Sequence, residues 1–387
     1  MKKLKRAALL GLSAAMLTAA PMTALAGSPE FARSAEEWAK LRDNVLEYDE
    51  LAGLIHEYNA TVQKAGIDYN EFRKEYGTTN DEVANRYYEL ADELRSLDYP
   101  DVDDSNYAAM MAQVISSEMT ADQYEQTADD ALEDSYTKYM TNCQTEANLV
   151  ASAQTEMINY YLNLLQLEIA QRSREMQQDS YQSTINQLNV GMVTEVNVLT
   201  ALESVHTADQ TIQTTQSAIE TGRQKLQVMT GWKATDTPEI GELPALDLER
   251  IAAMNPEADK ETALANSYSQ IINLRKLENA RNSDKKETLQ TTVSENERSI
   301  YATLNAKYQS VLAYKTAYDL AVAQSNLSEQ SMQMAERMLA SGDMSQLQYR
   351  TQKNSTEISR LSVKVAELNL FQAMESYDWA VNGLAGS

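Results

Sequence analysis

The stretch NVGMVTEVNVL, from Asn189 to Leu199, decides the fold of this chain. Gly191 lies in a region otherwise free of glycine and proline, between two long segments with helical patterning. A related stretch, SGDMSQL from Ser341 to Leu347, follows 151 positions later. In each, two residues separate the glycine from Thr194 or Ser345. Glycine commonly follows a helix C-terminus and Ser or Thr caps the next helix, so each stretch predicts the tip of an antiparallel helical hairpin.

The arms behind the two tips have nearly equal lengths. Gly191 to Gly231 spans 40 residues, and Gly342 to Gly383 spans 41. The arm after the first tip has a strict seven-residue repeat, which is typical of a coiled-coil-like seam. Its branched positions are Val198, Val205, Ile212, Ile219 and Leu226, and its mostly small positions are Ala201, Ala208, Thr215, Gly222 and Met229. Before the second tip, a seven-step run comprises Ala313, Leu320, Leu327 and Met334. The sequence therefore predicts an internally duplicated all-α protein.

Elsewhere, periodicity and breakers predict the remaining elements. A helix is expected over 35–65 and ended by Gly66, and shorter helices over 81–97 and from 120 onward. The absence of glycine and proline permits one very long helix over 142–190. Residues 281–284 are expected to form a break in the second half.

Charge and cysteine content exclude several classes of protein. The formal net charge is −24, with 57 acidic and 33 basic residues, so binding to nucleic acid or anionic lipid is not expected. The most acidic segment, 68–134, holds 19 acidic and 4 basic residues. Cys143 is the single cysteine, which excludes an intrachain disulfide and a cysteine-based zinc site.

The N-terminus has the pattern of a secretory signal peptide. Basic residues at Lys2, Lys3, Lys5 and Arg6 precede an apolar stretch over 7–20. Ala24-Leu25-Ala26 then forms a small-x-small cleavage site before Gly27. An uncleaved membrane anchor is the alternative, although the apolar stretch is short for a membrane span. We expect the mature protein to act outside the cytoplasm.

No catalytic or metal-binding motif is present in the sequence. The two histidines, His56 and His206, fall in helical stretches with no partner at ligand spacing, and we expect ordinary helix-surface or seam residues. Nucleophile-elbow, phosphate-loop and zinc-protease motifs are absent. The sequence predicts no enzyme activity, no cofactor and no metal site.

The paired stretches resemble the tips of the TolC-like outer-membrane efflux protein family, in which a Gly is followed by a small polar residue and an acidic or amide one. The segment ends 226–231 and 377–383 and the openings at Asn59 and Asn255 also resemble the family. The resemblance implies that the hairpin tips dock to an adapter protein. These tip residues are Gly191, Met192, Val193, Thr194 and Glu195 in the first copy and Gly342, Asp343, Met344, Ser345 and Gln346 in the second.

In that family each half contains a long helical hairpin, and three chains form a tube of packed helices, an α-barrel. The tips meet a membrane-fusion adapter, which connects to an inner-membrane pump, either ABC-type or proton-driven. Two β-strands per half build a barrel in the outer membrane. Here the acidic segment and the 281–284 break occupy those places, and neither has the alternating runs of a lipid-facing strand. Barrel strands, and direct insertion into a membrane, are therefore not expected.

The expected organisation is a signal peptide over 1–26, a first TolC-like helical repeat over 27–232 with the acidic insertion 68–134, a linker over 233–253 and a second repeat over 254–387. The leading hypothesis is a trimeric efflux or export tunnel in the cell envelope, or in the outer membrane where the host has one. The alternative is a secreted coiled-coil structural or wall-associated binding protein without a conduit.

Overall fold

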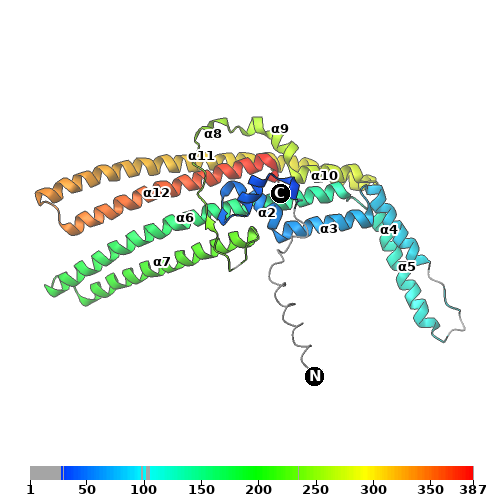
Figure 1. Ribbon diagram of the computed structural model, residues 1–387, viewed down its shortest axis with the longest axis horizontal. Coiled ribbons are helices and arrows are strands. Elements are labelled where there is room, and N and C mark those ends of the chain that lie inside the picture. The colour runs from blue at the N-terminus through cyan, green and yellow to red at the C-terminus, as the bar shows by residue number, and fades with distance from the viewer. Residues whose placement is uncertain (1–27, 29, 97–98, 102–104, 234, 387) are drawn as a thin grey trace, which may run out of the picture.

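The computed structural model describes residues 28, 30–96, 99–101, 105–233 and 235–386, so the expected signal peptide lies outside the described residues. The molecule is elongated and almost entirely helical (Figure 1). Two long hairpins, α6/α7 and α11/α12, run side by side to one end, and a third hairpin, α4/α5, projects from the opposite end. The expected all-α architecture of duplicated hairpins is confirmed.

The elements of the first half are η1 (Glu30–Ala32), α1 (Ala35–Leu41), β1 (Val45–Leu46), η2 (Tyr48–Glu50), α2 (Leu51–Tyr58), α3 (Ala60–Tyr76), α4 (Asn80–Arg95), α5 (Tyr107–Asp129), α6 (Ser135–Asn189) and α7 (Glu195–Met229). The remainder comprises β2 (Glu239–Ile240), α8 (Glu249–Ala253), α9 (Pro256–Asn266), α10 (Tyr268–Asn279), α11 (Ser283–Ser341), α12 (Gln346–Trp379) and η3 (Ala380–Leu384), a π-helical turn.

The first long hairpin pairs α6 with α7 along their lengths. All ten residues that make up the seven-residue repeat in α7 are buried or half-buried, which confirms the predicted seam. Its small positions allow close approach: a Cβ at Gly222 would lie 3.2 Å from Glu156 Oε1 of α6. Helix α6 covers the expected helix 142–190 as far as Asn189 and begins seven residues earlier, because the Asp134 carboxylate accepts the Thr137 backbone N–H as an N-cap.

The second long hairpin pairs α11 with α12, but the seven-step run before the tip does not form the contact between these two helices. Leu320, Leu327 and Met334 are 58%, 65% and 62% exposed, and Ala313 is exposed as well. The face of α11 toward α12 is instead formed by less conspicuous residues, among them Val311, Ser325, Ser328, Met332 and Ala335. Three of these five residues are serine or alanine, and a search for large apolar residues does not detect them.

The two long hairpins also pack on each other, through α6 and α12. Two apolar clusters lie where the shorter helices cover the hairpin bases. One comprises mainly residues of α1, α2 and α6, with Leu226 of α7 and Phe371 of α12. The other joins α9, α11, α12 and η3 around Ile300, Leu304 and Met374. The hairpins are therefore anchored at their bases, and their distal parts extend with only helix-on-helix contacts.

The opening segment differs from the single helix expected over 35–65. The chain leaves α1 at Leu41, forms β1 parallel to β2 of the linker, and re-enters a helix at Leu51. Asn59 then caps α3 by accepting the N–H groups of Thr61 and Val62. Gly66 does not end a helix: it lies inside α3 with open space around it. A glycine in an exposed helix interior costs only about 1 kcal/mol, which the surrounding turns of α3 offset.

The acidic segment forms helices where the resemblance placed strands. Helices α4 and α5 pack through small side chains at seven-residue spacing, Ala84 and Ala91 on α4 and Val114, Ala121 and Ala128 on α5, all buried. This spacing keeps the small residues on one face and lets the two backbones approach closely. In the second half, α10 occupies the corresponding place, and the expected break follows it at Ala280–Asn282.

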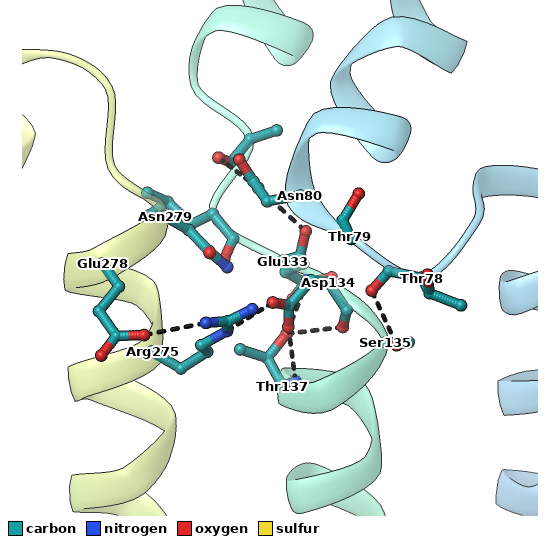
Figure 2. A network of polar contacts seen from close by, with 12 residues as sticks. Thr78, Thr79, Asn80, Glu133, Asp134, Ser135, Thr137, Arg275, Glu278 and Asn279 are labelled. Carbon is teal, nitrogen blue, oxygen red and sulfur yellow. Dashed lines mark hydrogen bonds and ion pairs between the residues drawn. The ribbon is translucent and has the colours of Figure 1, made fainter.

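A polar network fixes the α4/α5 hairpin to the body (Figure 2). Asp134, fully buried at the start of α6, accepts a hydrogen bond from Arg275 Nε of α10 at 2.6 Å. Asn80 of α4 donates to the carbonyl groups of Ala131 and Glu133, and Asn279 of α10 donates to that of Leu132. Side chains from both halves thus satisfy the backbone of the 130–134 turn, which sets the direction in which the hairpin projects.

None of the helices in the part of the chain that the structure describes combines the length and the hydrophobicity needed to cross a membrane.

Candidate docking site at the hairpin tips

The tip of the first long hairpin is a Schellman turn centred on Gly191. The Gly191 N–H donates to the Leu188 carbonyl and the Met192 N–H to the Gln187 carbonyl, both at 2.9 Å. These two bonds satisfy carbonyls that the end of α6 leaves without helical partners. Gly191 has φ +75°, a left-handed conformation that L side chains adopt only with strain.

The second tip repeats this geometry residue for residue. The Gly342 N–H donates to the Leu339 carbonyl at 3.1 Å and the Asp343 N–H to the Met338 carbonyl at 2.8 Å. Gly342 has φ +81°. At both glycines a Cβ would meet no atom within 4 Å, so the turn requires glycine for its backbone and not for lack of space. The predicted hairpin tips at Gly191 and Gly342 are thus both present.

In the helix that leaves each tip, the side chain of the third residue bonds back to the cap residue. Asn197 Oδ1 accepts from the Thr194 backbone N–H at 3.0 Å, and Gln348 Oε1 accepts from the Ser345 N–H at 3.0 Å. The Ser345 hydroxyl in turn accepts the Gln348 N–H. Sequence reasoning identified Thr194 and Ser345 but missed Asn197 and Gln348. Their place three residues after the cap, the spacing of a capping box, is the signal that would have found them.

The two tips present different surfaces. Around the first, four large apolar side chains are between 64% and 75% exposed: Val190, Met192, Val196 and Leu199. Val193 is half-buried and Glu195 is exposed beside them. At the second tip the exposed residues are Asp343, Ser345 and Gln346, whereas Met344 is half-buried. One tip therefore offers an apolar contact surface and the other a polar one.

Both tips lie at the same end of the molecule (Figure 1), held by a bridge between the hairpins. Arg350 of α12 and Asp179 of α6 form an ion pair of 2.9 Å, 8 and 12 residues along the chain from the tip glycines. No hydrogen bond or ion pair joins one tip to the other among the described residues. The tips are thus two separate exposed turns at one end of the molecule.

The other polar candidates in the body are structural contacts. No group of three or more His, Cys, Asp and Glu side chains in the described part of the chain is placed to hold a metal ion. His56 of α2 lies with Nδ1 2.8 Å from Glu146 Oε1 of α6, and this hydrogen bond raises the pKa of His56. Its partner lies 90 residues away in the chain, which explains why spacing along the sequence did not find it.

Comparisons with known proteins support the fold. No protein-family model matches the sequence, and neither does any curated protein. Among solved structures, a membrane protein from Pseudomonas aeruginosa is 12% identical, with a TM-score of 0.53 over 84% of this chain and 90% of its own. The outer-membrane channel OprN is also 12% identical, with a TM-score of 0.50 over 90% of this chain and 92% of its own. At this identity the likeness concerns the fold, and the chain has the TolC-like fold that the tips implied.

Proposed function

We propose that this protein is the extracytoplasmic tunnel component of an efflux or export complex, a trimeric helical tube that docks through its hairpin tips to a membrane-fusion adapter. In this proposal the chain acts in the cell envelope as a passive conduit and not as an enzyme. The division into repeats over 27–232 and 254–387, joined by the linker 233–253, belongs to the same proposal. The observation that carries it is the TolC-like pair of long hairpins whose outer faces remain uncovered in a single chain.

The uncovered face of α11 supports assembly. Leu320, Leu327 and Met334 recur every seven residues and point away from α12, each more than half exposed. A seven-residue apolar stripe is the pattern by which one helix packs on another. Full burial of a fully exposed side chain of this kind is worth about 1.5–3 kcal/mol, and a neighbouring copy would supply roughly the exposed fraction of that, 58–65%, for each of the three. A closed ring of chains would cover the stripe in every copy.

Replacing Leu320 and Leu327 together by glutamine is expected to convert trimers to monomers without loss of helicity, because both side chains are exposed within one chain. Light scattering coupled to size exclusion measures the mass, and circular dichroism the helicity. Electron microscopy of the wild type without detergent should show a hollow three-fold tube. The matched control replaces exposed Val228, outside the stripe, by glutamine and should remain trimeric. A wild type that stays monomeric at high concentration would contradict the proposal.

The tips support adapter docking through their shape and exposure. Both are rigid Schellman turns with open space around the glycine, and the first presents apolar side chains to solvent. Exposed apolar groups clustered at one end of an acidic molecule favour a contact with another protein. The glycine leaves no side chain at the apex, which allows a partner backbone to approach closely.

Replacing Gly191 and Gly342 by valine is expected to abolish adapter binding and export with little loss of helicity. A β-branched residue at positive φ reshapes the turn at a cost of about 1–2 kcal/mol, which is confined to the tip. Asparagine tolerates this conformation, so Gly191→Asn with Gly342→Asn should retain at least part of the binding. Pull-down with a membrane-fusion adapter from the same organism, and export in cells, measure the effect. Normal export by the valine variant would mean that the tips are only turns.

A further inference from the structure

The α4/α5 hairpin has an exposed apolar face that the proposed tunnel function does not use. On α5, Ala108, Ala112, Ile115 and Met119 follow one another at spacings of four, three and four residues, which places them on one helix face. All four are exposed, with Ile115 at 48% and Met119 at 62%. The opposite face of α5, with Val114, Ala121 and Ala128, is the one buried against α4. Ala108, Ala112, Ile115 and Met119, called the stripe from here on, therefore lie on the outside of the hairpin and are not part of its core.

The surroundings of the stripe are strongly acidic. Helix α4 has five acidic and two basic side chains, and α5 has four acidic and none that is basic. Both arginines are already held between carboxylates of the hairpin: Arg86 by Glu89 and Glu93, and Arg95 by Asp122 and Glu125. The two helices by themselves thus carry an excess of seven negative charges, one of which, on Asp81 at the base of the hairpin, is paired with Arg281.

Side-chain contacts with the rest of the molecule hold the base of the α4/α5 hairpin in place. Its base is fixed by the ion pair between buried Asp134 and half-buried Arg275, and by Arg281 of the second half, which donates to the Ala128 and Asn80 carbonyls. It projects from the end of the molecule opposite the tips (Figure 1). A fixed hairpin presents its stripe at low entropic cost on binding, because little of it needs to be ordered.

We propose that the outer face of α5 docks a basic amphipathic helix of a partner protein, whose apolar side covers Ala108, Ala112, Ile115 and Met119 and whose lysines or arginines meet the hairpin carboxylates. The stripe spans about 17 Å at 1.5 Å per residue, three turns of a partner helix. Ala108 and Ala112 leave room for large side chains at one end, and Ile115 and Met119 fill gaps between them at the other. This inference does not depend on adapter docking at the tips.

The negative charge of the hairpin distinguishes among the partners that could cover the α5 stripe. A second copy of the hairpin would bring two helix pairs with the same excess of seven negative charges together, and the repulsion opposes pairing. An anionic membrane surface is repelled for the same reason. A basic helix gains from both the apolar stripe and the acidic surroundings, and its association is expected to weaken as salt is added.

The test uses a fluorescently labelled 18-residue peptide with leucine on one helical face and lysine on the other, added to the purified protein in a polarisation titration. A peptide with glutamate in place of lysine is the charge control. We expect the lysine peptide to bind, its affinity to fall with salt, and the glutamate peptide not to bind. Ile115→Ser with Met119→Ser should weaken binding about tenfold or more, because the contact loses two buried apolar side chains.

Matched substitutions separate the stripe from general attraction to an acidic protein. Met110 is 44% exposed on α5 but off the stripe, and Met110→Ser should change the affinity less than about twofold. Equal binding by the wild type and the Ile115/Met119 variant, or binding of the glutamate peptide, overturns the inference. So does a loss of self-association in the Ile115/Met119 variant, which would assign the stripe to a second copy. Trimer formation and adapter binding, measured in parallel, report separately on the tunnel function.

Discussion

Replacing Gly231 by alanine is expected to destabilise the first half by about 3 kcal/mol or more, several times the cost of the same change at Gly191. The two glycines share a backbone conformation, with φ +80° and +75°, so the strain of positive φ is common to both. Their surroundings differ. A Cβ at Gly231 would lie 2.5 Å from Tyr58 Cβ and 2.6 Å from the Tyr58 carbonyl oxygen, whereas one at Gly191 meets nothing within 4 Å.

The reason for the close approach is the way α7 ends against the opening helices. Asn59, which caps α3, also donates from Nδ2 to the Met229 carbonyl at 2.8 Å. Gly231 therefore lies where two segments, 170 residues apart in sequence, meet backbone to backbone. Hydrogen exchange of the amides at the end of α7 and in α2 measures the local free energy of opening in both variants. Equal costs at Gly231 and Gly191 would show that Tyr58 moves aside freely and that only backbone strain matters.

Replacing Arg275 by methionine is expected to lower the free energy of opening at the α4/α5 base by about 3 kcal/mol at neutral pH, because it leaves the buried Asp134 carboxylate without its charge partner. Hydrogen exchange of amides in α4, α5 and the first turn of α6 measures the effect, since a local opening is not described by one global value. The matched control is Arg360→Met, which removes exposed pairs with Glu329 and Glu357 and should cost less than about 1 kcal/mol.

The pH dependence of the stability difference between wild type and Arg275→Met provides a second test of this prediction. Burial alone would raise the pKa of Asp134, but hydrogen bonds from the Thr137 N–H, Arg275 and Asn279 outweigh it, and the pKa lies below its ordinary value of 3.8. The stability from this depressed pKa is therefore present above the ordinary value and is lost as the pH falls through the lowered one. Without Arg275 the buried carboxyl binds a proton more readily, so the difference between wild type and Arg275→Met should shrink below about pH 4. A difference that is constant with pH would show that Asp134 is not the group that Arg275 stabilises.

The sequence by itself determined the long hairpins. A glycine followed by a Ser or Thr cap, equal arms of 40 and 41 residues, and a strict seven-residue seam in α7 depend only on neighbours along the chain. Helix ends and seams are local properties: a cap bonds within three residues and a seam repeats every seven, so periodicity reveals them. The tips at Gly191 and Gly342 were placed correctly for that reason.

Tertiary structure alone decided the rest. The run Ala313, Leu320, Leu327, Met334 has the spacing of a seam, yet it is exposed, and a different face of α11, with Ser325, Ser328 and Ala335, is covered instead. Gly66 was predicted to end a helix, yet α3 continues through it. The hydrogen bond from Arg275 to Asp134 joins residues that are 141 positions apart in the sequence. Which apolar face is buried, and which charges meet, depends on packing between distant segments, and a pattern read along one chain contains no measure of that packing.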